Sequence, residues 1–231
     1  MLARMAHVIY PYGPPIERAE NLWQIIGTLK FPVPRNMTIV RNRHGELLIY
    51  SAIAMHEEGM RLLEALGRPA VMVIPHRRHQ MDAAFYKARY PALRVLAPDA
   101  GRVRHVAVDG GLAELAEFGV QAYVLPGNTY EDVVLDIPLP GGRALCVCET
   151  LGNVAPPPGL ASVLFRLLGP PGGSFGIARA VRLREVRGTA QLRAWLETQA
   201  ERADVRCLLF GHGEPLTSDI PDALRRAATQ L

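Results

Sequence analysis

Apolar runs and amphipathic stretches alternate along the chain, and their spacing predicts its secondary structure. Short apolar runs bounded by turn residues predict strands, whereas apolar positions three and four residues apart predict helices. Strands are expected over residues 37–41, 46–50, 71–74, 93–96, 104–108, 120–125, 133–137, 144–148 and 205–210. Helices are expected over residues 16–29, 57–66, 80–90, 112–118, 160–168, 189–202 and 219–231.

The order of these elements favours an α/β fold built in layers. Strand and helix alternate in the first half, while the strands expected between 120 and 148 follow one another without long helices and should pair antiparallel. Residues 1–36 are rich in proline and form an expected irregular N-terminal lead-in, so the domain proper covers residues 37–231. Residues 151–177 are rich in proline and glycine around one apolar helix. This segment is either a mobile lid or a packed insertion without a function.

Composition excludes some classes of partner. The chain of 231 residues has a net charge of +4, and its scattered arginines form no basic stripe with interleaved aromatics. We therefore expect no nucleic-acid partner, while an anionic small-molecule ligand fits the charge. No apolar run approaches the roughly 20 residues of a membrane span, and the N-terminal apolar segment is short for a secretory signal. A cytoplasmic protein without a membrane partner is the expectation.

The three cysteines lie in apolar runs that are expected to form strands. They are Cys146, Cys148 and Cys207. An odd number of cysteines without a secretion signal indicates reduced thiols that act as small buried side chains. Zinc ligation by Cys148 is the alternative.

Polar residues follow four of the expected buried strands. The segments are VMVIPHRRHQMD, YVLPGNTYEDVVLDIP, LCVCETLGN and CLLFGHGEP. If these strands end at one edge, the side chains that meet there are His76, His79, Asn128, Glu149 and His212. Imidazole and carboxylate groups are ligands for zinc, iron or manganese. The alternatives are that both histidines of the first segment are solvated and that Asn128 only stabilises its turn.

The order of these segments resembles the metallo-β-lactamase-like superfamily over roughly residues 37–231. Residues 37–51 and 71–98 are most similar to a branch of it known only as a domain of unknown function. The resemblance implies a four-layer αββα sandwich with a metal site along one edge of its two sheets. The family motifs HxHxDH and PGHT, a bridging aspartate and a final GHG correspond to the four segments.

Several family ligands are replaced in this chain, so the resemblance implies a degenerate metal site. Laid from His76, the motif HxHxDH meets His76, Arg78, Gln80 and Met81. Asn128 stands at the histidine of PGHT, Glu149 replaces the aspartate, and His212 is retained. A guanidinium at a ligand position would repel a divalent cation or would replace its charge.

Two hypotheses follow from this comparison. In the first, the protein is a hydrolase-like enzyme of unknown substrate with a remodelled, at most mononuclear site. His76, His79, Glu149 and His212 then hold one zinc, iron or manganese ion, which activates water at an ester or similar bond. In the second, the protein is an inactive, metal-free relative. Arg78, Gln80 and Asn128 then line a site for an anionic small molecule or a partner protein.

Overall fold

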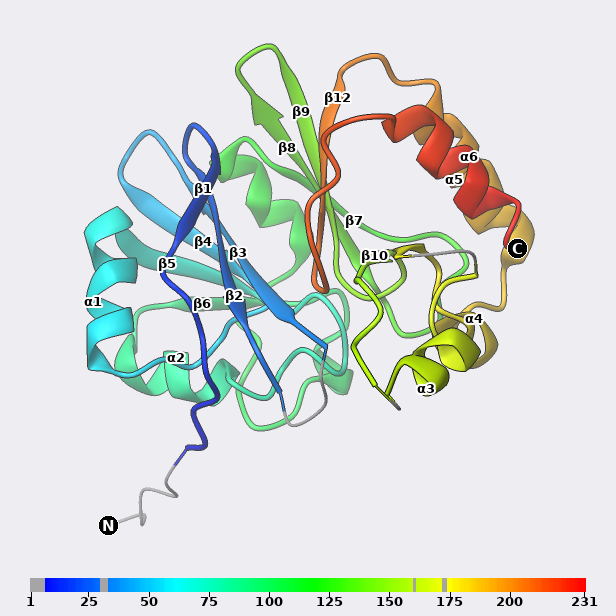
Figure 1. The fold of residues 1–231 in the computed structure, drawn as a ribbon. Helices are drawn as coiled ribbons and strands as arrows, with labels where there is room; N and C mark the ends of the chain where they lie inside the picture. Colours follow the sequence, from blue (N-terminus) through cyan, green and yellow to red (C-terminus); the bar gives the residue numbers. More distant parts are fainter. Residues whose placement is uncertain (1–6, 30–32, 160, 172–173) are drawn as a thin grey trace.

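Two β-sheets pack face to face, and helices cover the outer face of each (Figure 1). The structure is a computed structural model that describes residues 7–29, 33–159, 161–171 and 174–231. The six-stranded sheet has the order β1-β2-β3-β4-β5-β6 and the four-stranded sheet the order β12-β9-β8-β7. The expected four-layer αββα sandwich is therefore confirmed.

The first sheet is antiparallel from β1 to β4 and parallel from β4 to β6. Its strands are β1 (Ile16–Ala19), β2 (Leu22–Gly27), β3 (Arg35–Arg41), β4 (Glu46–Tyr50), β5 (Arg68–Val73) and β6 (Arg94–Leu96). Its outer face is covered by α1 (Glu57–Leu66) and α2 (Ala83–Arg89).

The second sheet pairs β7, β8 and β9 antiparallel, as expected, and adds β12 parallel to β9. Its strands are β7 (Gln121–Val124), β8 (Val133–Leu139), β9 (Gly142–Val147) and β12 (Val205–Phe210). Its outer face is covered by α5 (Thr189–Ala200) and α6 (Ile220–Ala228). The remaining elements are the 3₁₀ turns Ala100–Arg102 and Leu112–Phe118, the short strands β10 (Gly152–Asn153) and β11 (Phe175–Gly176), and the helices α3 (Ala161–Leu168) and α4 (Arg179–Glu185).

Three hydrophobic clusters fill the three spaces between the four layers. In β4, Leu47 and Ile49 pack toward α1 and α2, while Leu48 and Tyr50 pack between the two sheets. This alternation follows from the two-residue period of a strand. Because β4 is buried on both faces, its residues Leu47 to Tyr50 are all apolar or aromatic. A third cluster joins the second sheet to α5 and α6, with Leu145 facing Leu196 and Leu224.

The helix expected over 16–29 is wrong. The chain forms β1 and β2 there, joined through Asn21, which has a φ of 61°. Leu22, Ile25 and Ile26 have helical spacing, but β2 pairs along its whole length with β3 and is buried on both faces. Tertiary pairing thus outweighs the local pattern. The division of the chain at residue 37 stays a prediction.

Two further expectations differ from the structure. Residues 104–108 form no strand, because His105 adopts a φ of 70° that interrupts an extended run. Val106 and Val108 instead pack as loop residues against the first cluster. The helix expected from residue 80 begins at Ala83, and α4 has no counterpart in the sequence prediction.

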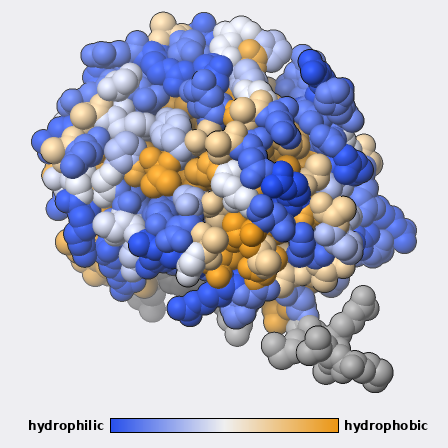
Figure 2. All heavy atoms as spheres, turned by 180° about the vertical axis from the view of Figure 1, so that it is seen from behind, coloured by the Kyte–Doolittle hydropathy of each residue, from blue (hydrophilic) through white to orange (hydrophobic). Residues whose placement is uncertain are grey.

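Hydrophilic side chains cover most of the face opposite to that of Figure 1, with smaller hydrophobic groups between them (Figure 2). Within the described residues, no helix combines the length and the apolar character needed to cross a lipid bilayer.

Candidate metal centre

The predicted site residues lie at the edge where β5, β9 and β12 end. His76 and His79 belong to the turn after β5, Glu149 follows β9 and His212 follows β12. Because β9 and β12 are parallel neighbours, their carboxyl ends place Glu149 beside His212. Gly211 allows this approach: a Cβ there would collide with the backbone of Cys148.

Three of these side chains meet at one point. The ligand atoms of His79, Glu149 and His212 all lie within 4.8 Å of one another. Oε2 of Glu149 lies 2.9 Å from Nε2 of His79 and 3.1 Å from Nε2 of His212. Two imidazole nitrogens and a carboxylate oxygen form a set that suits zinc or a similar divalent ion.

The two imidazoles are held by hydrogen bonds on their far sides. Nδ1 of His212 donates to the carbonyl oxygen of Pro34 at 2.6 Å, and Nδ1 of His79 lies 2.7 Å from the hydroxyl of Ser51. In the neutral form of His212 the Nε2 lone pair therefore faces the Glu149 carboxylate. Two acceptors at 3.1 Å repel each other unless a proton or a metal ion lies between them. The geometry of the pair thus fits either a protonated imidazole or a bound metal ion.

The charges of His79, Glu149 and His212 are determined by their burial and by the hydrogen bonds between Glu149 and the two histidines. Burial lowers the pKa of His79 to about 4, so that its imidazole is neutral at pH 7. Burial also disfavours charge on His212, but the hydrogen bond and charge of Glu149 outweigh it and raise the pKa of His212. The pKa of Glu149 is well below its usual value despite burial, because both histidines bond to it. An ionised carboxylate beside a neutral imidazole is ready to bind a metal.

Asp132 fixes the turn that carries Glu149, and the sequence analysis did not single it out. Its buried carboxylate accepts hydrogen bonds from the backbone N–H groups of Cys148, Glu149 and Thr150, at 3.1, 3.0 and 2.6 Å. The available signal was an acid directly before an apolar run, where an unpaired carboxylate would be costly.

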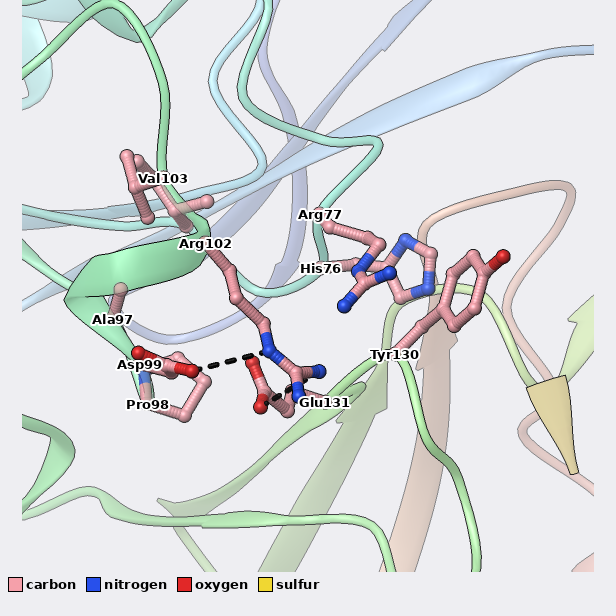
Figure 3. A pocket seen from close by; sticks show the side chains of 10 residues that line it. His76, Arg77, Ala97, Pro98, Asp99, Arg102, Val103, Tyr130 and Glu131 are labelled. Atoms are coloured by element: carbon pink, nitrogen blue, oxygen red, sulfur yellow. Dashed lines mark ion pairs between the residues drawn. The ribbon is translucent and has the colours of Figure 1, made fainter. Parts of the chain in front are cut away.

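His76 lies outside the group of three. Its Nε2 lies 3.0 Å from Oε2 of Glu185, a residue of α4 that is fully buried. Its ring stacks on Tyr130 with centroids 5.7 Å apart, and the Arg77 guanidinium lies 4.3 Å from the centre of the same tyrosine ring (Figure 3). The four-ligand set predicted from the sequence is therefore divided: His79, Glu149 and His212 converge, while His76 pairs with Glu185.

Arg78 joins the two parts of the site. Its Nη2 lies 3.0 Å from Oε1 of Glu149 and forms an ion pair with Glu185. The guanidinium thus occupies the side of Glu149 that faces away from the two histidines. Among the described residues, no other group of three potential ligands converges as His79, Glu149 and His212 do.

Gln80 and Asn128, the other predicted lining residues, each bond to their own turn and to one other segment. The Gln80 amide donates to the carbonyl of Arg77 and accepts from the N–H of Arg104, each at 2.5 Å. Asn128 donates to the Thr150 hydroxyl at 2.9 Å and accepts from the N–H of Tyr130 at 2.6 Å. The bond from Tyr130 agrees with the turn-stabilising alternative for Asn128, and the bond to Thr150 joins this turn to the one that carries Glu149.

A cavity of about 450 Å³ opens beside the group of three. Glu149, His212 and Arg78 form its polar end, and side chains of α3 form one wall. The proline- and glycine-rich segment 151–177 therefore borders the site. Its role as a mobile lid stays a prediction.

Neither the known protein-family models nor the curated proteins include a match to this chain. Solved structures do resemble it. A DIM-1 metallo-β-lactamase exposed to ceftazidime is 14% identical, with 96% of this chain and 99% of that chain covered and a TM-score of 0.63. A metallo-β-lactamase from Erythrobacter litoralis with β-mercaptoethanol in its active site is 17% identical, with coverage of 94% and 96% and a TM-score of 0.61.

FIM-1 from Pseudomonas aeruginosa, solved in a mono-zinc form, is 13% identical to this chain. The match covers 96% of this chain and 96% of that chain, with a TM-score of 0.61. At these identities the likeness concerns the path of the chain and not its chemistry. The order of the layers and the near-complete coverage of both chains in these comparisons lead to one conclusion. This chain has the metallo-β-lactamase fold.

Proposed function

We propose that the protein is a hydrolase-like enzyme that holds one divalent metal ion, with zinc as the first candidate. The observation that carries this proposal is the convergence of His79, Glu149 and His212, whose ligand atoms lie within 4.8 Å of one another. Both imidazoles are oriented by hydrogen bonds to Ser51 and Pro34, as metal-bound histidines usually are. The mono-zinc form of FIM-1 gives a precedent for one metal on this fold.

A bound metal would supply Lewis acidity and a lowered pKa for water, which together favour hydrolysis of an ester or similar bond. The protein's own residues have distinct tasks. Ser51 and Pro34 orient the imidazoles, and Asp132 holds the Glu149 turn. The guanidinium of Arg78 offers a fixed positive charge next to the site, where it stabilises negative charge on a substrate or on a developing oxyanion.

A metal-free anion-binding protein is the second candidate, and one observation favours it. Both oxygens of Glu149 already have cationic or hydrogen-bonding partners, with Arg78 on Oε1 and the two histidines on Oε2. The carboxylate is thus satisfied without a metal, and Arg78 provides the charge that an anionic ligand requires.

Elemental analysis of the purified protein distinguishes the two candidates. After incubation with zinc, manganese or iron and removal of free metal, we expect about one metal ion per chain. His212→Ala should remove it, whereas His44→Ala, at an exposed hairpin turn, should keep it. No metal under any condition, or the same content in His212→Ala, would overturn the metal proposal and favour the anion-binding candidate.

A further inference from the structure

The cavity beside Glu149 and His212 is mainly apolar. Its volume of about 450 Å³ lies within the roughly 300–1,000 Å³ that small-molecule sites occupy. Apart from its polar end, the side chains that form its walls include Val33, Val154, Leu164, Phe165, Leu168 and Val181. One end of this cavity can therefore hold reacting atoms, while the rest favours a hydrophobic group.

Helix α3 presents apolar side chains that nothing in the described protein covers fully. No residue of α3 is buried, and the side chains of Leu164 and Leu168 are 43% and 45% exposed although they line the cavity. Exposed apolar area of this kind is unfavourable in water and marks a binding surface when it gathers in a concave site. A ligand in the cavity would cover these two leucines.

Two arginines line the cavity. Arg184, an exposed residue of α4, lines the cavity together with Arg78. Arg78 is engaged with Glu149 and Glu185, whereas Arg184 forms no ion pair with any described residue. Positive charge on the cavity lining favours a ligand that carries or develops negative charge, such as a carboxylate product.

We propose that this cavity binds the apolar acyl group of the substrate and, after reaction, the fatty-acid-like product. The assignment rests on the hydrolase function proposed above and names its substrate class: esters with a medium-length apolar acyl chain. Water adds to the ester carbonyl carbon at the polar end, the carbon–oxygen bond to the leaving group breaks, and the leaving oxygen takes a proton. The products are a carboxylate, a proton and an alcohol.

Binding of product-like acids tests the cavity without requiring turnover. Acetate, butanoate and octanoate are titrated into the protein by calorimetry. Each added methylene that enters the cavity should tighten binding by about fourfold. Leu168→Asp, which places a charge on the cavity wall, should abolish the gain with chain length. The matched control is Leu167→Asp, on the same helix but outside the cavity lining and 64% exposed, and it should leave the gain intact.

Two results would overturn the assignment. One is octanoate binding no more tightly than acetate. The other is an equal loss in both leucine variants, which would indicate a nonspecific apolar surface on α3. A gain with chain length that only Leu168→Asp removes supports the assignment.

Hydrolysis of p-nitrophenyl acetate, butyrate and octanoate by the metal-loaded protein separates this inference from the proposed function. Turnover of all three esters with no preference for the longer chains would overturn the substrate class while the hydrolase function stands. Absence of both metal and turnover, with octanoate still bound through Leu168, would overturn the hydrolase function and leave an apolar-acid binding site. Preference for octanoate that Leu168→Asp removes supports both.

Discussion

Nη2 of Arg78 lies 3.0 Å from Oε1 of Glu149, while Oε2 of the same carboxylate faces His79 and His212. Glu149 thus has a permanent cation on one side and the candidate metal position on the other. Because a guanidinium stays charged at all physiological pH values, this arrangement supplies one fixed and one exchangeable positive charge.

Replacing Arg78 should therefore impair hydrolysis more than metal binding. We expect Arg78→Gln to retain about one metal ion per chain and to lose roughly 10–100-fold in kcat/KM, the usual cost of removing a group next to a metal site. Arg78→Lys keeps the charge without the forked geometry and should recover part of the rate. Steady-state kinetics and metal content measured on the same samples check this prediction.

Arg77 provides the matched control, because its guanidinium lies 4.3 Å from the centre of the Tyr130 ring and makes no ion pair with Glu149. Arg77→Gln should keep both rate and metal. Loss of the metal in Arg78→Gln would show that the guanidinium helps to build the site and does not act on the substrate.

Glu149, which is half-buried, and Glu185, which is fully buried, should respond differently to the same isosteric change. Glu149→Gln removes the carboxylate from the three-ligand group, so we expect the metal to be lost. Glu185→Gln leaves that group intact but removes the charge that pairs with His76 and Arg78. Its expected effect is a loss of about 3 kcal/mol in the free energy of unfolding, with metal content unchanged.

Metal analysis and denaturant unfolding of both variants check this contrast. If Glu185→Gln also abolished metal binding while remaining folded, the metal would have to lie nearer to His76. The four-ligand set predicted from the sequence would then regain support over the group of three.

Asp132 should be needed for the position of Glu149 as well as for stability. Its carboxylate accepts three backbone N–H groups, and an asparagine amide would turn a donor toward at least one of them. We expect Asp132→Asn to cost about 2 kcal/mol of stability and to weaken zinc binding by 10–100-fold.

Asp136, in strand β8, offers a control four residues after Asp132, because it is also a buried aspartate but pairs with Arg143 and Arg202. Asp136→Asn should lower the melting temperature without changing the zinc affinity. Equal weakening of zinc binding in both variants would mean that global stability, and not the Glu149 turn, determines the affinity.

Sequence patterns correctly predicted those helices and strands whose conformation is determined by their own residues. Helix α1 has the predicted bounds 57–66, because its amphipathic face and the following Gly67 are local signals. Strand β2 was mistaken for a helix, because its partner β3 and not its own spacing decides its conformation. Long-range pairing is the information that a local pattern lacks.

The same limit applies to the site. Glu149 and His212 could be placed from the ends of their strands, but the position of His79 depends on a tight turn. Its N–H donates to the carbonyl of His76 at 2.8 Å, and the turn directs His79 toward Glu149. The partner of His76, Glu185, lies 109 positions away in a helix that the sequence analysis did not predict. No local spacing connects such a pair.

The stability of the metal-free protein should fall as the pH drops from about 6.5 to about 4, and His79 is the main cause. Burial lowers its folded-state pKa to about 4, whereas an unfolded histidine titrates near pH 6.5. Between these values the unfolded chain binds a proton that the folded protein does not, which favours unfolding by up to about 3 kcal/mol. Glu149 adds a loss only below about pH 4.3, the unfolded value of a glutamate, because its lowered pKa gives stability that disappears as the pH falls from there through the folded value.

The contribution of His212 to the pH dependence of stability has the opposite sign. Its raised pKa gives stability that is fully present below about pH 6.5 and is lost as the pH rises through the folded value. Denaturant unfolding of the metal-free protein at pH 7 and pH 4.5 measures the sum of these effects. In His79→Gln the loss between the two pH values should be smaller by about 2 kcal/mol, because the protonation step of this buried imidazole is gone. An unchanged loss in the variant would show that His79 does not control the acid sensitivity between these pH values, and that other titrating groups do.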